Sequence, residues 1–292
     1  MMAAIPVIPG AMDTMEKFAY EKDRNTHRII SANIRVALPD DDAAGNGWNV
    51  RKDICAQIIR KKNPDIICCQ EVLKVQDQDM RNSFPGFGVF GFEGPEMDAF
   101  PEGYHGIAKN IIMYSKKRYE FISSGCYWLS ETPLIAGSKS WDTARARHCN
   151  WMRLRDKNAN REFRIINTHL DHVAQVAREK QVRMIMDESK QYREDFPQLF
   201  TGDFNSDAKN EVIKGMKAGG WTDTYAAIHG DVDPGPAVHG FKGPDSKPGR
   251  NGRIDFIFSK GPVKPLASEI IKDSVNGKYP SDHYFIYADV SF

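Results

Sequence analysis

The sequence predicts a mixed α/β fold in which strands and helices alternate along the chain. Short apolar runs rich in β-forming residues recur from residue 28 to the C-terminus, and each has the length of a strand. Between some of these runs, apolar residues return at the spacing of a helix. The alternation of the two patterns predicts a mixed α/β sandwich.

The predicted elements follow from these patterns in chain order. The predicted strands are the apolar runs at residues 28–34, 65–71, 110–114, 151–154, 163–170, 198–201, 253–258 and 284–290, and several of them carry polar side chains at or near one end. The first helical set precedes the helix-stopping pair Asn63-Pro64 and comprises Val50, Ile54, Ile58 and Ile59. The second follows His169 and comprises Val173, Val176, Val182, Ile185 and Met186. We expect both sets to face the core. Two irregular stretches, 86–106 and 228–252, exceed normal connector length and are expected to form rim loops that select the substrate.

Length and composition favour one large domain. No linker or low-complexity tract divides the 292 residues, so we predict an N-terminal extension at 1–25 and a single domain at 26–292. A hydrophobic content of 41% suffices for a large core, and the longest apolar runs are too short for a transmembrane helix. We therefore expect a soluble protein, and a monomer.

The cysteines and the N-terminus leave the location of the protein open. The five cysteines lack the spacing of a disulfide framework or a zinc site, which favours a reducing compartment. Cys68 and Cys69 are adjacent in a predicted strand and should pack on opposite faces. The first ten residues are too short and too proline-rich for a complete signal peptide. The protein is either cytoplasmic or exported after loss of a signal peptide that this sequence does not contain.

The motif Gly202-Asp203-Phe204-Asn205 predicts chemistry at the end of a strand. Alternate strand residues share a face, so Asp203 and Asn205 can point at one bound group. A carboxylate can take a proton from water, and an amide can donate to a phosphoryl oxygen without adding negative charge. The pair therefore suits hydrolysis of a phosphate ester.

Other strand ends carry polar side chains of the same kind. They supply an amide at Asn33, carboxylates at Glu71 and Asp255, an imidazole at His169, and the pair Asp282-His283 before the last strand. Strand ends at one edge of a sheet are where α/β proteins assemble their sites. Singly, each residue also has a structural reading, as a turn residue, a solvated charge or a hydrogen-bonded histidine.

Together and in this order, these blocks resemble the endonuclease/exonuclease/phosphatase family, a deoxyribonuclease I-like superfamily of metal-dependent enzymes. It includes DNA nucleases, deadenylases, sphingomyelinases and inositol polyphosphate 5-phosphatases. The resemblance runs from about residue 28 to the C-terminus. The stretch from Trp128 to Trp151, which includes Arg147, looks like a largely bacterial branch nearest the deadenylase-like members. The resemblance implies a four-layer α/β sandwich, with two facing mixed β-sheets flanked by helices.

Charge logic, checked against the resemblance, suggests a role for each residue. Glu71 is the expected metal ligand, completed by Asn33 and Asp282, and oxygen ligands favour Mg²⁺ or Mn²⁺. Asp203 would activate the attacking water, and Asn205 would hold a phosphoryl oxygen. His283, oriented by Asp255, and His169 would stabilise the phosphate charge. The expected substrate-binding residues are Arg147, Tyr114 and His239, although Tyr114 equally fits a core position.

The substrate is the least determined part of this interpretation. A net charge of +1 gives no global basic excess of the kind that grips long nucleic acid. We therefore expect a metal-dependent hydrolase for a small phosphoester of sugar, inositol or lipid-headgroup type. Two alternatives stay open: a nuclease acting on single-stranded nucleic acid, and a catalytically silent binding module with the same fold.

Overall fold

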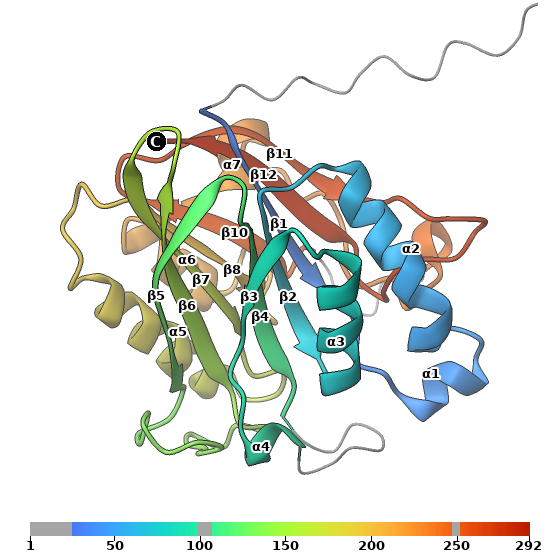
Figure 1. The fold of residues 1–292 in the computed structure, drawn as a ribbon. Helices are drawn as coiled ribbons and strands as arrows, with labels where there is room; N and C mark the ends of the chain where they lie inside the picture. The colour runs from blue at the N-terminus through green and yellow to red at the C-terminus, as the bar shows by residue number, and fades with distance from the viewer. Residues whose placement is uncertain (1–24, 99–106, 247–251) are drawn as a thin grey trace, which may run out of the picture.

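Two six-stranded β-sheets form the centre of the molecule, and helices flank them (Figure 1). The computed structural model describes residues 25–98, 107–246 and 252–292. The first sheet has the order β11 (Lys264–Ile271), β12 (Phe285–Ser291), β1 (His27–Asn33), β2 (Ile66–Val72), β4 (Lys109–Ser115) and β3 (Phe87–Phe90). The second has the order β5 (Tyr119–Trp128), β6 (His148–Asp156), β7 (Arg161–His169), β8 (Gln198–Asp203), β10 (Asp255–Lys260) and β9 (Thr222–Asp223).

The helices complete a four-layer sandwich, which confirms the predicted fold class. They are α1 (Pro39–Ala43), α2 (Trp48–Lys61), α3 (Lys74–Ser83), α4 (Pro95–Asp98), α5 (Gln175–Ser189), α6 (Glu211–Ala218) and α7 (Thr224–His229), with a 3-10 turn at Gly243–Asp245. Helices α2 and α3 pack on the outer face of the first sheet, and α5 and α6 pack on the outer face of the second (Figure 1). A third apolar layer lies between the two sheets.

The alternation of strand side chains explains why the β2 sequence is apolar throughout. Ile67 and Cys69 face the helices α2 and α3, whereas Ile66 and Cys68 face the second sheet. Both faces of β2 are therefore buried, as expected for a strand at the centre of a sandwich. The two cysteines pack on opposite faces, as the sequence predicted.

The prediction that both helical sets face the core was only partly correct. Ile58 and Ile59 are buried against the first sheet, and Ile185 is buried against the second. Val50, Val173 and Val176 are instead exposed, at 48%, 64% and 58%. Helix α5 begins only at Gln175, so Val173 precedes it, and Val176 falls on the solvent side of its first turn. Apolar spacing alone did not locate where the helix begins.

Strand direction brings the predicted catalytic residues to one edge. Strands β1 and β2 are parallel, as are β7 and β8, so Asn33, Glu71, His169 and Asp203 end their strands at the same edge. Strand β10 runs antiparallel to β8 and places Asp255 directly opposite Asp203. The residues before β12 reach this edge too, because β12 is antiparallel to β1.

A buried polar cluster fastens the two sheets together behind that edge. Asn167 of β7 accepts a hydrogen bond from Gln70 of β2 (2.7 Å) and donates two, to the carbonyls of Cys69 and Ile111 (both 2.9 Å). Thr201 of β8 donates to the same amide oxygen (3.2 Å). One side chain of the second sheet thereby holds two strands of the first.

Parts of the predicted organisation lie outside the described residues. They include almost all of the N-terminal extension, residues 99–106 of the first rim loop and residues 247–251 of the second. The division into an extension and one domain stays a prediction. Within the described ranges, no helix combines the length and the apolar character needed to cross a membrane.

Candidate active site

A pocket of about 370 Å³ opens at the edge where the predicted residues meet. Its acidic side chains are Glu71, Asp203 and Asp282, and its basic ones are Arg35, Arg145, Arg147, His169, His172 and His283. A larger groove of about 670 Å³ lies between α5 and α6 but contains none of the predicted site residues. The smaller pocket is therefore the candidate active site.

Glu71 is placed by an irregularity in β2. The pairing with β4 slips between Cys69 and Val72, and Glu71 takes a left-handed backbone conformation with φ of 60°. Bulges of this kind occur beside active sites, where they redirect a side chain that regular pleating would place elsewhere. The Glu71 carboxylate accepts hydrogen bonds from Asn33 Nδ2 (3.0 Å) and from the Val36 amide (3.1 Å). Burial opposes its charge, but His283, these donors and Arg35 keep the pKa of Glu71 below its ordinary value.

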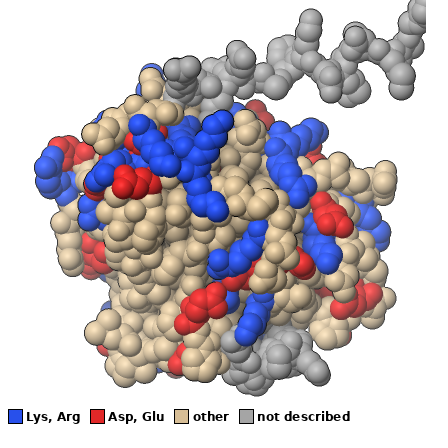
Figure 2. Space-filling model, viewed as in Figure 1, with Lys and Arg blue, Asp and Glu red and all other residues tan. Residues whose placement is uncertain are grey.

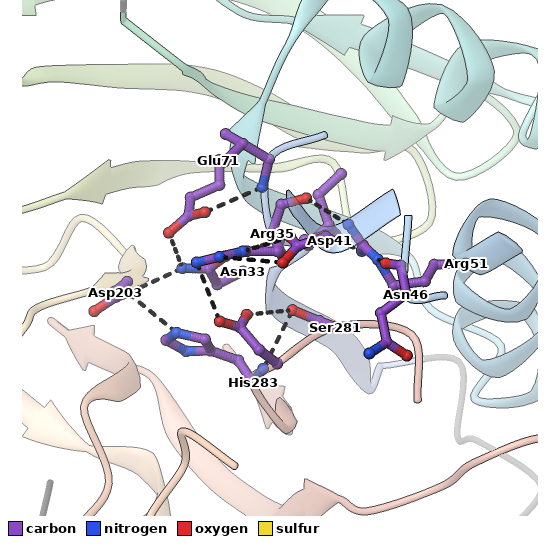
Figure 3. Close-up of polar contacts among 12 residues, drawn as sticks. Asn33, Arg35, Asp41, Asn46, Arg51, Glu71, Asp203, Ser281 and His283 are labelled. Carbon is purple, nitrogen blue, oxygen red and sulfur yellow. Dashed lines mark hydrogen bonds and ion pairs between the residues drawn. The ribbon is translucent and has the colours of Figure 1, made fainter. Parts of the chain in front are cut away.

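Asn33 holds two carboxylates in place through its amide nitrogen. Its Oδ1 accepts the backbone N–H of Arg35 (3.0 Å), which fixes the orientation of the amide. Its Nδ2 donates to Glu71 and to Asp203 Oδ2 (both 3.0 Å) (Figure 3). In this arrangement the amide nitrogen of Asn33 faces the carboxylates, and its expected role as a metal ligand stays a prediction.

Asp203 is a buried carboxylate with an unusual proton affinity. Burial, with repulsion from Asp255, raises the pKa of Asp203 to about 7, although His283 and the donors Asn205 and Asn33 oppose the shift. A base with a pKa near neutrality is well matched to proton transfer at neutral pH. The carboxylate is held by the Asn205 backbone N–H (2.9 Å), because Asn205 adopts a tight left-handed turn with φ of 48°.

His283 and Asp255 form the expected pair. The Nδ1–H of His283 donates to Asp255 Oδ2 (2.9 Å), which leaves Nε2 facing Asp203 Oδ2 at 4.0 Å. Burial would lower the pKa of His283, but attraction and hydrogen bonding to Asp255, with attraction to Asp282 and Asp203, raise it well above its ordinary value. The site thus sets a cationic imidazole beside a carboxylate that titrates near neutrality.

Asn205 and His169 are bonded to each other. Asn205 Nδ2 donates to the Leu170 carbonyl (3.1 Å) and to His169 Nε2 (2.9 Å). His169 Nε2 is therefore an acceptor in this arrangement, and it lies 3.4 Å from Asp203 Oδ2. The expectation that both side chains donate to phosphate requires this bond to open. As found, Asn205 orients His169.

The acidic side chains fit a divalent cation. Oxygen or nitrogen atoms of Glu71, His169 and Asp203 lie within 4.8 Å of one another. Burial, with repulsion from Glu71, raises the pKa of Asp282, although His283 and Arg35 oppose the shift. Hard carboxylate oxygens are the donors that Mg²⁺ and Mn²⁺ prefer. Glu71, with His169 and Asp203 close to it, could hold such an ion, and Asp282 lines the same pocket.

Arg147 lies in the pocket with few partners of its own. The side chain is 7% exposed, its Nη2 donates to His172 Nδ1 (3.3 Å), and its Nε is buried without a hydrogen-bond partner. Within the described residues, no carboxylate lies within ion-pair distance of the Arg147 guanidinium. A buried guanidinium in this state is suited to bind an anion.

Two predicted substrate contacts, Tyr114 and His239, are not among the residues that line the pocket. Tyr114 pairs with Ile66 at the start of β2, and it stacks on Phe121 rather than facing the pocket. Because five residues separate Ile66 from Glu71, Tyr114 lies roughly 16 Å away along the strand, at the opposite edge. The sequence placed Tyr114 at the end of a strand but did not show that β4 runs antiparallel to β2.

His239 also lies outside the pocket lining. Its ring stacks on Tyr284 with centroids 4.1 Å apart, and its Nδ1 accepts the Gly243 backbone N–H (3.1 Å). Burial lowers the pKa of His239 to about 4, so the ring is neutral at neutral pH. Its backbone N–H donates to the Asp282 carbonyl (2.8 Å), and this bond joins the loop to the Asp282–His283 segment.

Sequence reasoning missed Arg35 and underestimated His172. Arg35 follows Asn33 by two residues at a strand end, and that spacing is the signal that could have placed it on the same face. From sequence, His172 was interpreted as a residue at the start of a helix that could cap it. Helix α5 begins later, at Gln175; Asp171 accepts the backbone N–H groups of Val173 (3.0 Å) and Ala174 (2.7 Å), and His172 lines the pocket.

Known proteins share this fold. A protein from Bacteroides vulgatus is 29% identical, with a TM-score of 0.79 over 91% of this chain and 99% of that one. A mannosyl-6-phosphatase from Bacteroides thetaiotaomicron is 26% identical, with a TM-score of 0.78 over 91% of this chain and 100% of that one. The catalytic domain of human nocturnin, at 20% identity, a TM-score of 0.71 and coverage of 92% and 94%, shares the fold alone.

One curated relative and a family model complete the comparison. An uncharacterized protein of Acanthamoeba polyphaga mimivirus is 28% identical over 171 residues, which are 56% of this chain and 60% of that protein. The model of the endonuclease/exonuclease/phosphatase family matches residues 30–283, a span that contains every pocket residue described above. On the match to the family model, the chain belongs to the endonuclease/exonuclease/phosphatase family, whose members hydrolyse phosphoester bonds.

Proposed function

We propose that this protein is a metal-dependent phosphoesterase that hydrolyses a small phosphate ester by attack of an activated water. The observation that carries the proposal is the convergence, in one pocket, of a base titrating near neutrality, a cationic imidazole and paired carboxylates. Asp203 has a pKa of about 7, and His283 is held beside it by Asp255. A catalytically silent relative has no need to keep these groups together.

Each residue has a role that its surroundings support. Asp203 orients the attacking water and takes its proton, while Asn33 and the Asn205 backbone keep that carboxylate in position. Protonated His283 donates to a phosphoryl oxygen as negative charge develops there. Glu71 and Asp282 would hold Mg²⁺ or Mn²⁺, which when bound supplies positive charge to the phosphate.

The substrate proposal rests on the basic side of the pocket. Arg147 and Arg145 lie among its lining residues, and they can neutralise one or two phosphates. On the face shown in Figure 2, acidic and basic side chains are interspersed, and the basic ones gather near the top of the view. The turns that carry Lys116, Lys117 and Lys157 lie at the edge opposite Glu71, so their charges do not lead into the pocket. We therefore favour a sugar-like or headgroup phosphoester over duplex DNA.

The similarity to a mannosyl-6-phosphatase supports the same preference. That protein matches almost the whole chain at 26% identity, and its name denotes a phosphate ester of a sugar. We extend the class, a sugar phosphate, to this chain as a proposal, without the identity of the sugar.

The test is a phosphoester panel with metal-stripped protein. Sugar phosphates, inositol phosphates, small diesters, plasmid DNA and oligoribonucleotides are compared at physiological salt with Mg²⁺, Mn²⁺ or chelator. We expect turnover of a small ester that needs the metal, with Asp203→Asn inactive and Arg147→Ala raised in KM. Chelator-resistant turnover by metal-stripped protein would refute the metal assignment. Efficient duplex nicking with small esters untouched would refute the substrate class while leaving phosphoester hydrolysis in place.

A further inference from the structure

Arg35 has a backbone that is fixed at the mouth of the pocket. Its φ of 56° is left-handed, and three hydrogen bonds hold the residue there. Its N–H donates to Asn33 Oδ1 (3.0 Å), and its carbonyl accepts from Gln76 Nε2 (2.8 Å) and from Arg51 Nη2 (3.2 Å). This conformation is costly for a residue with a side chain, and here it sets the direction of the Arg35 side chain.

The guanidinium of Arg35 joins two carboxylates from different parts of the chain. Its Nε and Nη2 donate to the two oxygens of Asp41 in α1 (2.9 and 3.4 Å), and its Nη1 lies 3.4 Å from Asp282 Oδ2. Figure 3 shows the group in the space between Glu71, Asp41 and His283. The carboxylate of Glu71 also lies near enough to stabilise the positive charge of Arg35.

Asp282, one of the two carboxylates proposed to hold a metal, is therefore already paired with a cation. Glu71 and Asp282 repel each other across the pocket. Within the described residues, Arg35 is the one Lys or Arg side chain within ion-pair distance of Asp282. The side chain is 30% exposed, so it is free to swing toward Asp41 alone without crossing the core.

We propose that Arg35 is an internal counterion that competes with the divalent cation for Asp282. Without metal, its guanidinium neutralises Asp282 and eases the repulsion with Glu71. When a metal binds, Arg35 gives up Asp282 and keeps its two hydrogen bonds to Asp41, which serves as its second anchor. The proposal rests on the metal site proposed above and adds to it a residue that sets metal affinity and stabilises the metal-free site.

The proposal predicts opposite effects for two substitutions. Removing the competitor in Arg35→Met should tighten Mn²⁺ and Mg²⁺ binding by about ten-fold, the scale of one charge-assisted hydrogen bond. Removing the second anchor in Asp41→Asn should weaken binding, because Arg35 then depends on Asp282. In the double variant the loss of Asp41 should have little further effect, because there is no guanidinium left to anchor.

The double-mutant cycle separates competition from long-range electrostatics. If only through-space charge mattered, Asp41→Asn would weaken metal binding equally with and without Arg35. Arg145→Met is the matched control, since it removes a positive charge from the same pocket lining, whereas Arg35 is the residue paired with Asp282. It should change metal affinity less than Arg35→Met does.

The experiment measures metal binding directly, not turnover. Calorimetric titration of the metal-stripped full chain with Mn²⁺ and Mg²⁺ gives Kd, and thermal unfolding with and without metal gives the stabilisation. We expect Arg35→Met to melt lower than wild type without metal and to gain more from its addition. Arg35→Gln provides a second variant if Arg35→Met folds poorly. Equal or weaker binding by both variants would overturn the counterion alone, whereas absence of metal binding by wild type would overturn the metal site as well.

Discussion

The ionised form of Asp203, which the proposed catalysis needs, is the form that destabilises the folded protein. Its pKa rises from 3.8 to about 7 on folding, because burial and Asp255 disfavour the charge. The unfolded chain thus loses this proton near pH 4, and the folded chain keeps it until about pH 7. The stability that Asp203 contributes is present below pH 4 and is lost as the pH rises through 7.

Asp203→Asn should therefore stabilise the metal-free protein at pH 8 while removing its activity. We expect a gain in unfolding free energy of roughly 1–3 kcal/mol at pH 8 that disappears near pH 4. Turnover should fall by roughly a hundred- to ten-thousand-fold. Urea unfolding at the two pH values, with activity at pH 7.5, checks both parts. A variant with a lower free energy of unfolding than wild type at pH 8 would show that the charge of Asp203 does not destabilise the folded state.

Asp255 should set the pH range in which the enzyme works. Asp255 raises the pKa of both His283 and Asp203, so Asp255→Asn should lower both. Both limbs of the kcat/KM profile should then move to lower pH, and activity at pH 8 should drop by roughly ten- to a hundred-fold. The pH dependence of kcat/KM for wild type and variant tests this.

A matched control exists at the far end of the sandwich. Asp156 is also buried beside a histidine, with His27 at 3.6 Å, but it lies outside the pocket. Asp156→Asn should reduce stability without moving the pH profile. If both variants move the profile alike, or neither does, the role of Asp255 is structural.

The identities of the site residues could be predicted from sequence better than their roles. Strand ends meet at one edge, so a set of polar residues there predicts a site without knowledge of the loops. The roles of Asn33 and Asn205 depend on which neighbour fixes each amide. Those neighbours, the Arg35 N–H and the Leu170 carbonyl, take their positions only in the folded chain.

At the scale of elements, the irregularity in β2 is the feature that delivers Glu71 to the pocket. A regular strand alternates its side chains strictly, and no sequence pattern around Gln70-Glu71 indicates the slip in pairing. Strand direction was equally hidden, which is why Tyr114 was assigned to the wrong edge. Helix position could be predicted to within a turn, and Val50, Val173 and Val176 show the limit.

The left-handed backbone of Glu71 can be tested by comparing two small replacements. Glu71→Gly and Glu71→Ala both remove the carboxylate, so both should lose metal binding. They differ in that alanine is strained at a φ of 60° and glycine is not. We expect the glycine variant to be more stable by about 1 kcal/mol in urea unfolding. Equal stability would mean that the backbone relaxes once the glutamate is gone.

At the scale of the whole molecule, the pocket is built from residues of both sheets. Glu71 and Asn33 belong to the first sheet and Asp203 and His169 to the second, so their distances depend on how the sheets are set against each other. Asn167 fixes the position of one sheet against the other through its hydrogen bonds to the backbone of β2 and β4. The sandwich could be predicted because its strand and helix patterns are local. This fastening could not, because it joins residues distant in sequence.

Asn167→Ala should affect stability and catalysis together. It removes four buried hydrogen bonds and takes a partner from Gln70 and from two carbonyls, so we expect a loss of roughly 2–5 kcal/mol in unfolding free energy. Protein that remains folded should also show a lower kcat, because the hydrogen bonds that fix β7 against β2 are lost. Urea unfolding and kcat at low temperature measure the two effects. Asn158→Ala, in the exposed turn before β7, should change neither.

The pairing of β1 with β12 determines when the pocket can form during synthesis. These strands lie at opposite ends of the sequence, and the residues before β12 are Asp282 and His283. While the chain emerges from a ribosome, one edge of β1 has no partner strand. Glu71 of β2 and Asp203 of β8 are then already synthesised, but His283, which completes the pocket, is not. A chain cut short after Pro280 would keep most of the core yet expose the edge of β1. We therefore expect such a chain to aggregate or to be degraded, and not to retain partial activity.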